Sequence, residues 1–167
     1  DNSYTKEQQK QIIFHFNGQI VLPKFKNESQ IEDLLEVTGR SIKLKMILLV
    51  ENPIGFLNLP EILKKFHSQI HGVGFGSHDF CSITGMKHTL ENLAHFKRLL
   101  ILYTKAYNVA YIDGVDLNLN NFEQFRNECL FAFDIGAEGK FIIHPSQLYE
   151  MTTNVSFMSE EELVELK

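Results

Sequence analysis

The stretch MILLVENPIG, residues 46–55, indicates the fold because it joins an apolar run to a compact polar motif. The same form occurs in VLPKF (21–25), VGFGSHDF (73–80), VAYIDGV (109–115) and KFIIHPSQL (140–148). Short apolar runs rich in β-branched residues are typical of strands buried on both faces. Polar groups just past the C-terminal ends of successive buried strands predict one site built from several loops, as at the mouth of a parallel α/β barrel.

Strands and helices are expected to alternate along the chain, which predicts βα units and a parallel sheet in a single domain, residues 1–167. The expected strands are 19–22, 45–50, 72–75, 110–112 and 140–143. Four helices are expected at 3–17, 57–66, 89–107 and 121–135. Another is expected to be capped by Asn27 or Ser29 and to end at Gly39, and a last one is expected to begin at Ser159.

Five parallel strands fit two architectures. They can form an open, doubly wound sheet. They can also form five of the eight units of a TIM barrel, which takes about 250 residues when closed. In the second case the edge strands need a cover, so we expect a homo-oligomer or a complementing chain.

Composition excludes several classes of function. The net charge is −5 and the basic residues are scattered, so a nucleic-acid partner is not expected. No apolar run is long enough to span a membrane. Cys81 and Cys129 lack metal-site spacing, which predicts a reduced, cytoplasmic protein. A reactive thiol is the less favoured alternative for these cysteines.

Glu51 and Asp79 are the strongest candidate pair for chemistry. Each follows a buried strand by a few residues. Neighbouring strands lie about 4.8 Å apart, so both carboxylates can reach one point. Two carboxylates with waters and substrate oxygens form a natural Mg²⁺ site, and the metal would polarise a carbonyl as a Lewis acid. The alternative is that both carboxylates stabilise the N-termini of the following helices.

Other residues at the strand ends suggest substrate contacts. The glycine-rich turn at Gly76 and Ser77 can donate N–H groups to an anion. Lys24 can bind a substrate carboxylate, form a Schiff base, or pair with a neighbouring carboxylate. Asp113 can bind a polar ligand group or shape the turn with Gly114. His144 can act as an acid or base, although a structural role is favoured.

Taken in order, these motifs resemble the citrate lyase β-subunit family, within the metal-dependent HpcH/HpaI aldolases and lyases. The resemblance runs from about residue 19 to residue 167. It rests on IVLPKF, LLVENPIGFLNLPEI, VGFGSHDF, YIDGV, GKFIIHPSQL and FMSEEEL. Each segment is unspecific alone, but all of them in this order are highly specific.

The resemblance implies a TIM-barrel enzyme that uses Mg²⁺ to cleave or form a 3-hydroxyacyl-CoA thioester. The partners would be a 2-oxo acid such as oxaloacetate and an acyl-CoA or acyl-carrier thioester. It assigns Glu51 and Asp79 to the metal. It assigns the main chain of Gly76 and Ser77 to the oxo acid's carboxylate, and Ile112 and Asp113 to the lining of the thioester site.

The chain also departs from the family pattern. Family members carry three further βα units, with a substrate-binding arginine, ahead of the unit that IVLPKF resembles, so the expectation is a chain holding five-eighths of the barrel. Asn52 stands where the family usually has threonine. The sequence therefore leaves two functions open: a lyase of the citrate lyase β type, or a non-catalytic relative that acts as a subunit or binding protein.

Overall fold

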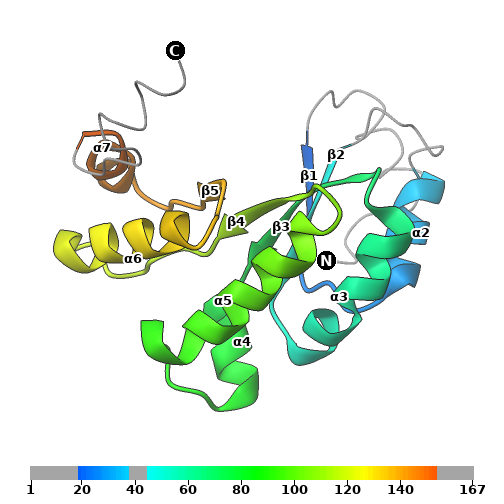
Figure 1. Cartoon of the computed structure of the whole chain (residues 1–167), viewed down its shortest axis with the longest axis horizontal. Helices are drawn as coiled ribbons and strands as arrows, with labels where there is room; N and C mark the ends of the chain where they lie inside the picture. The colour runs from blue at the N-terminus through cyan, green and yellow to red at the C-terminus, as the bar shows by residue number, and fades with distance from the viewer. Residues whose placement is uncertain (1–18, 38–44, 154–167) are drawn as a thin grey trace.

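The computed structural model describes residues 19–37 and 45–153, in which strands and helices alternate (Figure 1). The strands are β1 (Gln19–Leu22), β2 (Lys45–Val50), β3 (Ile70–Phe75), β4 (Ala110–Asp113) and β5 (Gly139–Lys140). The helices are α2 (Glu28–Val37), α3 (Pro53–Phe66), α4 (Ser77–Thr84), α5 (Leu90–Lys105), α6 (Phe122–Asp134) and α7 (Pro145–Thr153). The expected helices at 3–17 and from Ser159 lie outside the described residues.

All five strands are parallel, and each pairs with the next in the sequence, in the order β1-β2-β3-β4-β5. A doubly wound sheet reverses its strand order at a switch point, so that architecture is excluded. Sequential order is the order of a (β/α)₈ barrel, and the prediction of an α/β fold of that type with five strands is confirmed. In Figure 1 the helices follow one another in chain order from α2 and α3 at one end to α6 and α7 at the other.

The two faces of the sheet differ. Leu48, Val73 and Tyr111 point to one face and belong to a continuous core with the apolar sides of the helices. Side chains alternate along a strand, so Leu49 and its register partner Gly74 point to the opposite face. On that second face, which in a closed barrel is the interior, Val21 is 44% exposed.

Several helix boundaries differ from expectation. Helix α3 begins at Pro53 rather than Leu57, because Asn52 caps it by accepting a hydrogen bond from the N–H of Gly55 at 2.9 Å, and proline suits the first helical position. Helix α4 was not expected; it ends at Gly85, whose φ of 71° suits a left-handed cap.

The C-terminal part of the sheet also differs from expectation. Strand β5 ends at Lys140 instead of continuing to 143, and the unexpected helix α7 begins at Pro145. In the described part of the chain, every helix is too short or too polar to cross a lipid bilayer.

Candidate metal and substrate site

The C-terminal ends of β2 and β3 open into one pocket of about 300 Å³. Glu51 follows β2 directly, and Asp79 lies in the first turn of α4. Both carboxylates line this pocket, together with Lys24, Lys26, Asn52, Ser82 and Ile83. The structure thus brings together three residues singled out from the sequence: Lys24, Glu51 and Asp79.

Glu51 is held by its neighbours on both sides. Its Oε2 accepts a hydrogen bond from the main-chain N–H of Lys24 at 2.7 Å. A Cβ placed on Gly76 would lie 2.3 Å from the Cγ of Glu51. Only glycine therefore lets the Glu51 side chain lie across the start of α4. Glu51 and Gly76 lie opposite each other because each is two residues beyond the register partners Leu49 and Gly74.

The helix-capping alternative explains one of the two carboxylates. Helix α3 is capped by Asn52, so Glu51 is not needed for that purpose. Asp79 lies in the first turn of α4, where a negative charge is favourable. A stabilising role at the N-terminus of α4 can therefore explain Asp79. The N-terminus of α3 does not explain Glu51, because Asn52 already caps it.

The donor set in the pocket fits Mg²⁺. Mg²⁺ prefers oxygen ligands, keeps several waters, and is often bound by only one or two carboxylates. Within residues 19–37 and 45–153, no group of three or more His, Cys, Asp or Glu side chains could enclose an ion. A pair of carboxylates open to solvent and substrate is thus the type of site these residues could offer.

Gly76 and Ser77 lie at the N-terminus of α4. The N–H of Gly76 donates to the carbonyl of Val50 at 2.9 Å, so the N–H groups of this terminus that lack a partner within the helix begin at Ser77. The Ser77 hydroxyl is buried and lies 2.9 Å from Nε2 of His88. Burial, and then the neighbouring His78, lower the pKa of His88, so its ring is neutral at pH 7 and can accept this hydrogen bond. The main chain of Ser77, rather than its hydroxyl, is therefore the group suited to an anion.

Asp113 lies in the buried core instead of the pocket. Its carboxylate is 2.9 Å from the Nζ of both Lys97 and Lys140, and it accepts a hydrogen bond from the Tyr111 hydroxyl at 3.1 Å. Burial alone would raise the pKa of Asp113, but the two ammonium groups outweigh it and hold the pKa below its ordinary value. Ile112 points to the other face of β4, 3.2 Å from where a Cβ on Gly72 would lie. Neither residue lines the pocket of Glu51, and their predicted contact with a thioester stays a prediction.

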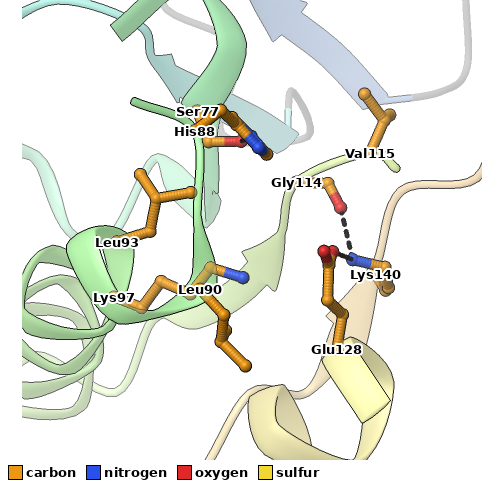
Figure 2. A pocket seen from close by; sticks show the side chains of 9 residues that line it. All are labelled: Ser77, His88, Leu90, Leu93, Lys97, Gly114, Val115, Glu128 and Lys140. Carbon is orange, nitrogen blue, oxygen red and sulfur yellow. Dashed lines mark hydrogen bonds and ion pairs between the residues drawn. The ribbon is translucent and has the colours of Figure 1, made fainter. Parts of the chain in front are cut away.

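The lysines of this cluster were missed by sequence reasoning. Lys140 also donates to the carbonyl of Gly114 at 2.8 Å and lies 3.8 Å from Glu128. Figure 2 shows Lys140 between these two groups. A signal was available for Lys97, which lies between Leu93 and Leu100 on the buried side of α5. A charged residue on such a face indicates a buried ion pair.

The two cysteines are unsuited to chemistry. Both Cys81 and Cys129 are buried and free. Burial raises the pKa of both thiols, that of Cys129 to about 11. Since the thiolate is the reactive form, the reactive-thiol alternative loses its support.

The structural role favoured for His144 was that of a buried histidine, whereas the structure places His144 at the surface. Its Nδ1 accepts a hydrogen bond from the N–H of Ser146 at 3.2 Å. Its carbonyl accepts another from the N–H of Gln147 at 3.0 Å. His144 thus caps the start of α7.

The chain is similar in sequence to a known protein family and similar in structure to solved proteins. Residues 3–145 match the HpcH/HpaI aldolase/citrate lyase family. A (3S)-malyl-CoA thioesterase of Cereibacter sphaeroides is 30% identical over 77% of this chain and 44% of its own length. The citrate lyase subunit beta of Leuconostoc mesenteroides subsp. cremoris is 29% identical over 81% of this chain and 45% of its own length.

A solved structure has the same fold. The citrate lyase beta subunit of M. tuberculosis, complexed with oxaloacetate and magnesium, matches with a TM-score of 0.68 at 22% identity. The match covers 81% of this chain and 59% of that structure. The chain spans about half the length of the curated relatives it matches.

Proposed function

Because the chain belongs to the HpcH/HpaI aldolase/citrate lyase family, we propose that it carries the magnesium-binding part of a carbon–carbon bond lyase. The reaction would cleave or form a 3-hydroxyacyl-CoA thioester, with a 2-oxo acid such as oxaloacetate and an acyl-CoA, or an acyl-carrier thioester, as the other partners. The observation that carries this proposal is the single pocket lined by Glu51 and Asp79. A relative of the same fold complexed with oxaloacetate and magnesium supports the ligand class.

The pocket and the adjacent start of α4, whose Gly76 and Ser77 do not line it, have expected roles. Glu51 and Asp79 would hold Mg²⁺, which when bound supplies the Lewis acidity that polarises the carbonyl of the oxo acid. The N–H of Ser77 would bind the carboxylate of the oxo acid at the N-terminus of α4, because the N–H of Gly76 already donates to the carbonyl of Val50. Lys24, exposed at the rim, would add positive charge facing an anionic substrate.

In the cleavage direction the bond that breaks joins the hydroxyl-bearing carbon to the α-carbon of the acyl group. The hydroxyl loses its proton to a base and becomes the oxo group, while the α-carbon gains a proton. The two products together contain every atom of the substrate. No oxidant or reductant is required.

Calorimetric titration of Mg²⁺, with and without oxaloacetate, tests the proposal directly. We expect the wild-type chain to bind Mg²⁺, with higher affinity in the presence of oxaloacetate. Asp79→Asn should lose this binding, whereas Asp33→Asn, an exposed residue outside the pocket, should retain it. Unchanged Mg²⁺ affinity in Asp79→Asn would refute the site.

A product assay separates the lyase from the thioesterase named among the relatives. Cleavage of the carbon–carbon bond in malyl-CoA yields an oxo acid and an acyl-CoA without a free thiol. Hydrolysis of the thioester releases free CoA thiol. After incubation with malyl-CoA, free CoA is measured with a thiol reagent and the oxo acid is measured separately. Free CoA would support hydrolysis. An oxo acid formed without free CoA would support the lyase.

A second candidate is a non-catalytic subunit or binding protein. The observation that favours it is the second face of the sheet, where Val21 is 44% exposed, although parallel sheets are normally covered on both faces. Light scattering after size-exclusion chromatography tests this. A stable assembly without Mg²⁺ affinity would favour the second candidate, and a monomer that binds Mg²⁺ would count against it.

A further inference from the structure

The turn that follows β1 approaches Glu51 through its main chain. Lys24 adopts a φ of 50°, a left-handed conformation that is uncommon for a residue other than glycine. In this conformation its N–H donates to Oε2 of Glu51 at 2.7 Å. The contact thus depends on the path of the backbone and not on the lysine side chain.

Asn52, the N-cap residue of α3, holds this turn in place from a buried position. Its Nδ2 donates to the carbonyl of Phe25 at 2.9 Å, while its Oδ1 caps α3 by accepting from the N–H of Gly55 at 2.9 Å. Both Asn52 and Phe25 are buried. A Cβ placed on Gly55 would lie 2.2 Å from the carbonyl oxygen of Phe25. Gly55 thus leaves the space into which the turn docks.

We propose that Asn52 is a positioning residue for the metal ligand Glu51, acting through the turn that delivers the Lys24 N–H. This inference rests on the proposed function, in which Glu51 binds Mg²⁺. With Oε2 engaged by Lys24, Oε1 is the oxygen left for a cation; it accepts no hydrogen bond from any other residue in the described part of the chain. Oε1 lies against Gly76, 3.1 Å from where a Cβ there would be.

A carboxylate that offers one oxygen favours Mg²⁺ over Ca²⁺. Mg²⁺ is satisfied by a few single-oxygen contacts and its own waters, whereas Ca²⁺ takes more oxygens and often both from one carboxylate. Asn52 should therefore influence both the Mg²⁺ affinity and the preference for Mg²⁺ over Ca²⁺. A residue that only stabilised the fold would change neither.

The test compares two asparagines that bind the same turn, the N-cap residue Asn52 and Asn58 within α3. Asn52→Ser keeps a side-chain cap for α3 but removes the donor to Phe25. Asn58→Ser removes an exposed bond, from Nδ2 of Asn58 to the carbonyl of Lys26 at 2.8 Å, which lies farther along the chain from the Lys24 N–H than the buried bond to Phe25. Mg²⁺ and Ca²⁺ affinities are measured by calorimetry, and folding is checked by circular dichroism.

We expect Asn52→Ser to bind Mg²⁺ about tenfold less tightly, as for other residues that orient a metal ligand, and to lose part of its preference over Ca²⁺. Asn58→Ser should match the wild type. Lys24→Gly, which keeps the N–H and suits the positive φ, should also keep the wild-type preference. If Asn52→Ser fails to fold, Gly55→Ala displaces the same turn while Asn52 remains, and the same losses are expected.

The outcomes separate this inference from the proposed function. A wild-type chain that binds Mg²⁺, with an Asn52→Ser variant of unchanged affinity and preference, would overturn the role of Asn52 alone. A loss of preference in Lys24→Gly would overturn the main-chain argument. A wild-type chain without Mg²⁺ affinity would overturn the proposed metal site and this inference with it.

Discussion

Asp113→Asn removes one charge from the buried cluster while keeping the shape of the side chain. In the wild type this carboxylate neutralises Lys97 and Lys140, whose side chains are 5% and 1% exposed. The amide can still accept a hydrogen bond, but it leaves two buried ammonium groups without their main counter-charge. Removing one partner of a buried ion pair destabilises a protein by about 3–5 kcal/mol, and we expect a loss of that size.

Urea unfolding followed by far-UV circular dichroism measures this loss, since the chain contains no tryptophan. Asp134→Asn, an exposed residue on α6, is the matched control and should change the free energy of unfolding by less than about 0.5 kcal/mol. Both variants are compared with the wild type at pH 7.

The pH dependence provides a second measurement. In Asp113→Asn, Lys140 loses the carboxylate that raises its pKa, while the burial that lowers it remains. Its pKa in the folded state should therefore lie below the unfolded value, so the folded state binds fewer protons. Stability of the variant should then rise as the pH increases from 7 toward 10. In the wild type, Asp113 has a lowered pKa, so its contribution is present above the unfolded pKa and is lost as the pH falls through the folded value.

A free energy of unfolding within 1 kcal/mol of the wild type would refute this reasoning. That result, combined with weaker binding of an acyl-CoA, would instead support the contact with the thioester that the family resemblance implies for Asp113. Lower stability without a change in acyl-CoA affinity, measured below the unfolding range, would support the structural role alone.

Three further predictions concern the pocket and the thiols. Gly76→Ala should weaken Mg²⁺ binding about tenfold or more, because the new methyl group would lie 2.3 Å from Cγ of Glu51; calorimetry with Gly85→Ser as a control for a general loss of glycine tests this. Ser77→Ala should leave oxaloacetate affinity nearly unchanged, since the main chain is the expected ligand; a large loss would implicate the hydroxyl. Cys129, with a pKa of about 11, should resist a thiol reagent at pH 7 until urea is added, as mass spectrometry would show.

The C-terminal ends of β1, β2 and β3 were predictable because their signal is local. The bounds of β1 and β2 were predicted correctly from apolar runs alone. Parallel pairing of consecutive strands then brings Glu51 and the start of α4 together, so two residues far apart in sequence could be assigned to one pocket. Proline at position 53 obscured the start of α3, because the same residue can end a helix or begin one.

The remaining parts of the site depend on contacts that residue types do not reveal. The bond from Lys24 to Glu51 comes from a main-chain N–H, which every residue except proline possesses. The partners of Asp113 come from α5 and β5, so their meeting depends on how these elements pack. In the sequence, Asn52 differs from the residue usual in the family, and nothing else distinguishes it. Its bond to the carbonyl of Phe25 depends on how the turn after β1 packs against the start of α3, and its other bond caps α3.

The sequential strand order has a consequence for how the chain acquires its structure. Within residues 19–37 and 45–153, each strand hydrogen-bonds to the strand that follows it in the sequence. Pairing among these strands therefore joins only consecutive units. Loop closure between neighbouring units is entropically inexpensive compared with closure over the whole chain. The order in which a ribosome releases these units is therefore also the order in which they can join the growing sheet, and the pocket of Glu51 can form as soon as α4 has emerged.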